Sequence, residues 1–233
     1  MRRIGLLGLT VAVLGLVSAG LSSVAQAALG LLPGGGGGGE GITMKIKGGG
    51  GGGSIGWETL GGKKVECNVV EGVAKSLHDD EGEIELKYKE CKEPALGTTC
   101  TGLADTSGNI TIPATYYFRY LLPSTGSGVN LAILIGQVHF SCSLVLVLVS
   151  GCYSSADATP LSTLTKELKI NFLEEKGDQK PTEIDNKAGT AMESCVLKMK
   201  FGSGAEESAA LFWNETVSKF EQGGKAIEVL LMI

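Results

Sequence analysis

Apolar residues are most concentrated at residues 138–152, where the sequence reads VHFSCSLVLVLVSGC. One set of alternate positions is apolar throughout: Phe140, Cys142, Leu144, Leu146 and Leu148. The other set starts polar and ends apolar: His139, Ser141 and Ser143, then Val145, Val147 and Val149. Successive side chains of a β-strand point to opposite faces, so the pattern predicts one strand that passes from half-buried to fully buried. We therefore place this strand at the centre of a β domain.

Shorter segments with the same period of two occur along much of the remaining chain. They cover residues 65–69, 84–88, 109–112, 115–122, 129–135, 168–172, 195–201, 209–220 and 227–233. Polar or glycine-containing turns separate them, including expected turns at residues 78–82 and at Gly136-Gln137. No segment keeps a helical period for more than about two turns. Many short strands separated by turns predict an all-β fold, either an antiparallel β-sandwich or a β-barrel.

The N-terminus has the organisation of an export signal. Arg2 and Arg3 precede an apolar segment, residues 4–21, and Ala25-Gln26-Ala27 supplies the small residues of a cleavage site. We predict a signal peptide at residues 1–27, which implies secretion to the extracellular space or the cell surface. The alternative is an uncleaved membrane anchor, although glycines interrupt the apolar segment.

Two glycine runs enclose a short alternating segment, residues 42–47, near the start of the mature chain. Polyglycine loses much backbone entropy when it becomes ordered, so residues 28–56 are predicted to form a flexible linker with one short possible edge strand. The folded all-β domain is expected at residues 57–233, beginning near Trp57.

Charge and hydropathy exclude several classes of partner. Removal of Arg2 and Arg3 with the signal peptide takes Lys+Arg from 20 to 18 against 25 Asp+Glu, so the formal net charge changes from -5 to -7. An acidic chain has no general attraction to nucleic acid or anionic lipid, and we expect no nucleic-acid partner. Residues 129–149 raise the alternative of a membrane span, but Gln137 and His139 interrupt them. We expect no membrane span after signal cleavage.

All six cysteines follow the cleavage site, and an oxidising compartment favours three disulfides. Strand alternation places Cys67 and Cys142 on apolar faces, so both are expected to point into the core. The preferred pairs are Cys67 with Cys142, Cys91 with Cys100, and, by elimination, Cys152 with Cys195. The main alternative joins Cys67 to Cys91 and Cys100 to Cys142.

Candidate catalytic residues are few. The two histidines are His78, in an acidic turn, and His139, on the apolar strand, and neither has a serine or cysteine in a nucleophile context nearby. Carboxylates on predicted strands alternate with lysines, as is typical of a solvated sheet face: Glu83, Glu85, Glu167 and Glu193. The acidic cluster at residues 79–83 lacks the spacing of a calcium loop, and C-x-x-C is absent. We predict no catalytic residue, no metal site and no cofactor.

Several short motifs are shared with a known group of proteins. They are residues 62–67 (GKKVEC), Cys91, Cys100, residues 140–142 (FSC), residues 177–180 (GDQK) and the last two predicted strands. In these motifs the chain after Trp57 resembles a paralogue-rich family of uncharacterised secreted proteins from actinobacteria. The family often has four of these cysteines, so the resemblance implies that Cys152 and Cys195 are additions that pair with each other. It implies no activity.

These features together predict a secreted, non-catalytic binding or structural module outside the cell or at its surface. Its expected partner is a cell-wall or extracellular polysaccharide, or a protein. Such a module can present either a flat sheet face or an exposed aromatic patch of Tyr116, Tyr117, Phe118 and Tyr120. The alternative is a secreted hydrolase of polysaccharide or ester, in which acids or His78 would converge in a deep cleft.

Overall fold

The computed structural model describes residues 30–33, 41–49, 55–78, 81–103, 105, 108–119, 128–154, 159–160, 164–172, 182–185 and 192–232. Within these ranges the chain forms strands and turns, and no helix there is long and apolar enough to cross a membrane. The expected signal peptide and most of both glycine runs lie outside the described residues.

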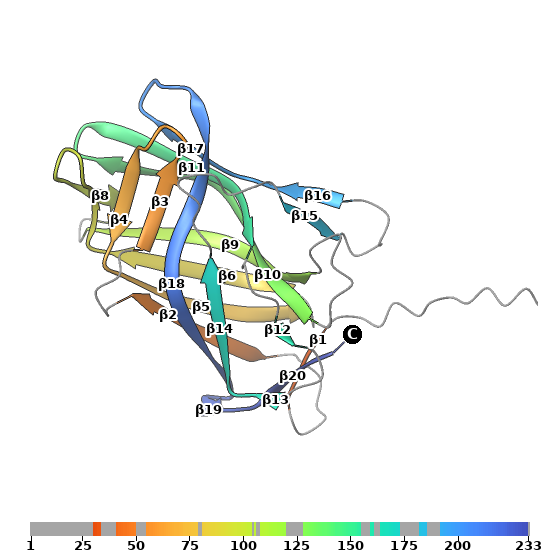
Figure 1. Ribbon diagram of the computed structural model, residues 1–233. Coiled ribbons are helices and arrows are strands. Elements are labelled where there is room, and N and C mark those ends of the chain that lie inside the picture. Colours follow the sequence, from red (N-terminus) through yellow and green to blue (C-terminus); the bar gives the residue numbers. More distant parts are fainter. Residues whose placement is uncertain are drawn as a thin grey trace, which may run out of the picture.

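Eight antiparallel strands form a closed barrel (Figure 1). Their order around the barrel is β2 (Ile42–Gly49), β5 (Val69–His78), β6 (Glu81–Lys89), β9 (Asn109–Arg119), β10 (Gly128–Cys142), β11 (Val145–Ser154), β17 (Leu197–Phe201) and β18 (Glu206–Gln222). The pairing of β18 with β2 closes the ring. The predicted all-β class is confirmed, and the architecture is a barrel.

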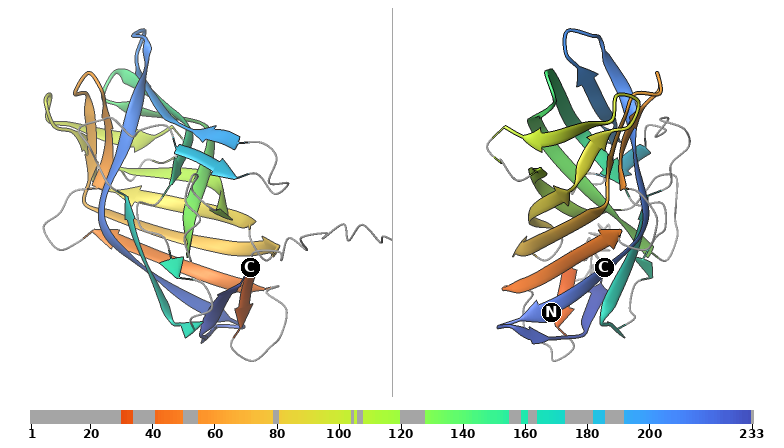
Figure 2. Two further views of the ribbon diagram at one scale, coloured as in Figure 1. Left: turned by 45° about the vertical axis from the view of Figure 1, so that its right-hand side comes forward. Right: turned by 90° about the vertical axis from the view of Figure 1, so that its left-hand side faces the viewer.

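A second set of strands links β10 to β18: β3 (Ile55–Thr59), β4 (Lys64–Cys67), β7 (Cys91–Glu93) and β8 (Thr98–Gly102). In Figure 1, β3, β4 and β8 lie above β5, β6 and β9. β3 pairs with residues 209–212 of β18, and β8 pairs with residues 140–142 of β10. β18 runs the height of the barrel (Figure 2), so β10 and β18 each pass from one set of neighbours to the other.

Shorter strands extend this framework. β14 (Glu167–Phe172) and β19 (Lys225–Ala226) pair with β18, and β12 (Thr159–Pro160) pairs with β10. β20 (Val229–Met232) pairs with β1 (Gly30–Pro33) and with β13 (Leu164–Thr165). β15 (Thr182–Asp185) pairs with β16 (Met192–Cys195).

The single strand predicted at residues 138–152 is wrong, because this segment is the hairpin of β10 and β11. Cys142 pairs with Val145, so the chain reverses at Ser143 and Leu144. The reversal resets the alternation and buries Phe140, Cys142, Val147 and Val149. No glycine, asparagine or aspartate marks this turn, and alternation alone therefore indicates a continuous strand.

The turn predicted at Gly136-Gln137 is also wrong. Both residues lie within β10, where the register with β11 shifts between Ile135 and Val138. Such a shift is a β-bulge, which bends a strand without ending it.

The segment expected as a short edge strand is a complete barrel strand, β2. It pairs with β5 on one side and β18 on the other, and its inward residues Ile42, Met44 and Ile46 are buried. The folded part of the chain therefore begins before Trp57. The burial of these apolar side chains inside the barrel outweighs the poor strand propensity of the glycines that flank β2.

Disulfides join neighbouring strands: Cys67–Cys91, Cys100–Cys142 and Cys152–Cys195. The expected pair Cys152–Cys195 is confirmed, but the preferred pairs Cys67–Cys142 and Cys91–Cys100 are wrong and the alternative pairs are present. Cys67 and Cys142 are buried as expected, yet β7 and β8 lie between their strands. These disulfides indicate an oxidising environment.

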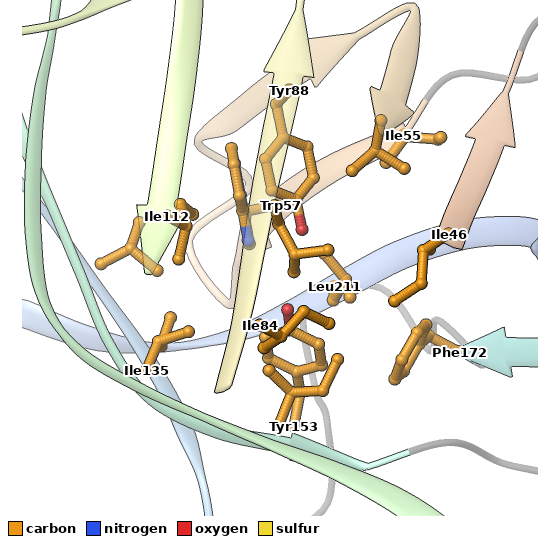
Figure 3. Close-up of a cluster of buried hydrophobic side chains, with 14 of the residues drawn as sticks. Ile46, Ile55, Trp57, Ile84, Tyr88, Ile112, Ile135, Tyr153, Phe172 and Leu211 are labelled. Carbon is orange, nitrogen blue, oxygen red and sulfur yellow. The ribbon is translucent and has the colours of Figure 1, made fainter. Parts of the chain in front are cut away.

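Aromatic side chains fill the barrel interior (Figure 3). Trp57 packs against Tyr88, with ring centroids 4.4 Å apart, and against Phe140 at 5.8 Å. Tyr153 meets Phe172 edge-on at 5.2 Å. The hydroxyl groups of Tyr88 and Tyr153 point toward each other in Figure 3, and both side chains are fully buried.

The buried tyrosines predict a loss of stability at alkaline pH. Burial raises the pKa of Tyr88 and of Tyr153 well above the usual value of a tyrosine. The unfolded chain releases these protons above pH ~10, whereas the folded chain retains them. The contribution of the two tyrosines to the free energy of unfolding should be fully present below pH ~10. Above that pH it should fall by up to about 1.4 kcal/mol per pH unit for each tyrosine. Urea unfolding at neutral and alkaline pH measures this loss. A Tyr88→Phe/Tyr153→Phe variant should lose less, and an equal loss would contradict the prediction.

Candidate functional site: a groove on the outer face of the barrel

The outer surface of the barrel has a groove where β10 changes its neighbour. β10 pairs with β9 as far as Ile135↔Ala114 and with β8 from Phe140 onward, and the bulge at Gly136 lies between the two pairings. An open groove of about 870 Å³ lies beside this point, across the paired strands β5, β6, β9 and β10. Its lining includes Val73, Lys75, Glu83, Glu85, Pro113 and Leu134.

Two residues help to explain why the strands separate at this point. Pro113, which has no backbone N–H, comes one residue before Ala114, where the pairing of β9 with β10 ends. Gly136 has no side chain, and a Cβ atom there would meet no other atom within 4 Å. The depth of the groove at Gly136 therefore depends on the absence of a side chain.

The groove combines exposed apolar side chains with charged ones. Val73 and Leu134 are each 44% exposed, because both side chains lie on the outer face of the barrel. Glu83 lies opposite Lys75, and Glu85 lies opposite Val73. Two carboxylates and one ammonium group leave the groove with a net negative charge.

The groove residues do not have the geometry of a catalytic centre. Glu83 and Glu85 are both exposed on one face of one strand, whereas acid–base catalysis by two carboxylates requires different environments on either side of the scissile bond. Among the side chains that the structure describes, no serine, cysteine or histidine lines the groove. In the described part of the chain, no group of three or more His, Cys, Asp or Glu is placed to hold a metal ion.

The expected aromatic surface patch is wrong for the residues that the structure describes. Tyr116 and Phe118 are each only 1% exposed and belong to the core. Tyr117 points to the opposite face, where it is half-buried against the disulfide of Cys152. Tyr120 lies outside the described residues. The inward positions of β9 continue through Tyr116 and Phe118, so these aromatic rings are needed for packing.

Of the two histidines, His139 does not line the groove. His78 is the last residue of β5, and its side chain, together with Asp79 and Asp80, lies outside the described residues. His139 is exposed on the outer face of β10. All six cysteines predicted as disulfide residues are oxidised, and none is a free thiol.

The strand carboxylates lie on solvated faces, as their alternation with lysine predicts. Glu83 and Glu85 are exposed, and Glu167 forms an ion pair with Lys219 at 3.3 Å. The side chain of Glu193 lies outside the described residues. Elsewhere on the same surface, a hydrogen bond from Lys89 lowers the pKa of Glu71. Exposed pairs of this kind contribute little to stability.

Sequence reasoning identified Glu83 and Glu85 but missed the apolar part of the groove. Val73 and Leu134 belong to strands whose neighbours are not known from the sequence. Pro113 inside a predicted strand and Gly136 beside an apolar run are the two signals that point to a strand separation here.

No protein-family model matches this chain, and neither a curated protein nor a solved structure is significantly similar to it.

Proposed function

We propose that this chain is a secreted, non-catalytic binding module that presents the groove to a partner outside the cell or at the cell surface. The groove itself carries the proposal. Val73 and Leu134 expose apolar surface in it, and Glu83 and Glu85 add charge. An apolar centre with a polar margin is typical of binding surfaces, and the groove volume lies in the usual range for ligand sites.

The surrounding structure supports a preformed site. The groove spans β5, β6, β9 and β10, and the inward residues of these strands, such as Ile84 and Ile135, are buried in the core. Binding to a rigid surface avoids the entropic cost of ordering it. The disulfides fit export into an oxidising environment, in agreement with the signal peptide expected at residues 1–27 and with the resemblance to secreted actinobacterial proteins.

The chemistry of the groove favours a protein segment over a polysaccharide. No described aromatic side chain lines the groove, so the described residues offer a sugar ring no flat surface on which to stack. A protein segment that carries an apolar side chain beside a basic one matches both Leu134 and the two carboxylates. We therefore propose a protein partner with an apolar residue and nearby lysine or arginine.

A phage-displayed random peptide library, selected against the purified protein, tests this function. The selected peptides should combine an apolar residue with lysine or arginine. Their affinity should fall about thirtyfold for Leu134→Asp, the loss typical of a binding hot spot. Leu164→Asp, at a leucine that is 51% exposed outside the groove, is the matched control and should bind normally. Selected peptides that bind Leu134→Asp with unchanged affinity would contradict a role for the groove.

The hydrolase alternative is tested on the same samples. Chromogenic glycosides and esters should not be turned over. Turnover that is lost in Glu83→Gln or Glu85→Gln would establish the hydrolase instead. Binding to insoluble peptidoglycan, cellulose or chitin that is unchanged in Leu134→Asp would place the binding surface elsewhere on the barrel.

A further inference from the structure

The turn between β10 and β11 exposes an apolar side chain that the fold does not require. Leu144 is 99% exposed in the two-residue turn Ser143-Leu144. Ser143 has a φ of 55°, a conformation in which asparagine, aspartate and glycine are preferred. A single exposed leucine is common on protein surfaces, but Leu146 is 45% exposed next to it. Together they form an apolar projection, residues 143–146, which we call the knob.

The knob is held firmly by its neighbours. The backbone N–H of Ser143 donates to the carbonyl of Thr99 at 3.2 Å, and the N–H of Gly202 donates to the carbonyl of Leu146 at 2.7 Å. A disulfide to Cys142 closes the base of the turn. Leu144 is therefore presented on a defined backbone, which lowers the entropic cost of docking it.

We propose that the knob of one copy docks into the groove of a second copy, so that this chain assembles head to tail. The inference rests on the proposed function, because it names the partner of the groove. Groove and knob lie on the same strand, β10, and roughly 30 Å of extended chain separates Leu134 from Leu144. One copy cannot fill its own groove. Each copy carries both surfaces, so every docked copy can bind a further one. Such a contact produces open chains or closed rings of copies.

The charges of the two surfaces are complementary. Lys92 lies beside Thr99, across β8 from the knob, and Lys200 lies opposite Leu148 on the other side of the hairpin. Glu66 lies opposite Lys92, and Glu206 lies opposite Lys200, but these carboxylates form their ion pairs with Lys64 and Lys198. The groove carries the exposed carboxylates of Glu83 and Glu85. Docking places apolar side chains against apolar side chains and brings the two lysines near the two carboxylates, which favours this orientation.

Sedimentation velocity over a range of protein concentrations tests the assembly. The wild type should associate, and the knob variant Leu144→Asp and the groove variant Leu134→Asp should each associate about thirtyfold more weakly. Gly136→Ile fills the groove without a backbone clash and should have the same effect. Leu164→Asp is the matched control and should associate like the wild type.

A mixture of the two aspartate variants gives the decisive result. Leu144→Asp retains the groove and Leu134→Asp retains the knob, so the mixture should form dimers through one contact and grow no further. A mixture that stays monomeric would overturn the head-to-tail arrangement, and so would a wild type that is monomeric at every concentration. If library peptides still depend on Leu134 in that case, the groove binds another protein and the proposed function stands. If they do not, the proposed function fails as well.

Discussion

Replacing Trp57 with alanine is expected to lower the free energy of unfolding by about 3–5 kcal/mol, the usual cost of truncating a buried aromatic residue. Trp57 is 0% exposed and packs against Tyr88 and Phe140, so its removal leaves a cavity where the second set of strands meets the barrel interior. Domains of this kind are stable by only about 5–15 kcal/mol in total. Equilibrium urea unfolding measures the loss.

Trp57→Phe is the matched control. The indole Nε1 of Trp57 is buried and makes no hydrogen bond with any described residue. Removing an unpaired buried donor relieves a penalty of about 1–3 kcal/mol, which offsets part of the lost packing. The phenylalanine variant should therefore lose clearly less stability than the alanine variant. Equal losses would show that the N–H group, rather than the ring, makes the important contact.

Alternation of apolar and polar residues is sufficient to predict the fold class but not the closure of the barrel. It identifies the inward face of strands such as β6 and β17, because the face depends only on neighbours in the sequence. Closure depends on the pairing of β18 with β2, which lie near opposite ends of the described chain. A sandwich and a barrel with the same strands have the same alternation, so alternation does not distinguish the two architectures.

Local turn chemistry explains the errors in strand boundaries. The turn at Ser143 has a positive φ without a glycine, whereas Gly136 lies inside a strand. The glycines that flank β2 indicate a linker with a short edge strand, although Ile42, Met44 and Ile46 of this strand complete the core. In each case long-range packing overrides the local preference of the residues.

The groove is harder to predict than the strands that form it. Its residues come from β5, β6, β9 and β10, and they meet because these strands pair in register, with Glu83 opposite Thr115 and Thr115 opposite Leu134. Glu83 and Glu85 could be assigned to a solvated face from their alternation with lysine. That Leu134 faces outward beside them, whereas Ile133 and Ile135 are buried, does not follow from the uniformly apolar run that contains all three residues.

Removing the disulfide between Cys100 and Cys142 is the second large effect that we expect. The sequence separation of 42 residues gives a loss of about 4 kcal/mol for Cys100→Ala/Cys142→Ala when chain entropy dominates. The same reasoning gives about 3.5 kcal/mol for the pair Cys67–Cys91, which is 24 residues apart. Urea unfolding of both double variants measures these losses. A larger loss at Cys67–Cys91 would show that packing of the strands, rather than loop length, sets the contribution.

The single variant Cys142→Ala should behave differently, because the cysteines form a row across four adjacent strands. Cys91 of one disulfide lies directly opposite Cys100 of the other, so the two disulfides are neighbours in this row. A free Cys100 thiolate therefore lies beside the Cys67–Cys91 disulfide. Its attack on the sulfur of Cys91 forms Cys91–Cys100 and releases the Cys67 thiolate, with no oxidant consumed. Peptide mapping without reduction should find both Cys67–Cys91 and Cys91–Cys100 in this variant. In Cys100→Ala/Cys142→Ala it should find Cys67–Cys91, and Cys152–Cys195 should be present in both variants. A single variant that retains Cys67–Cys91 alone would mean that the strands hold the sulfur atoms of Cys91 and Cys100 too far apart to exchange.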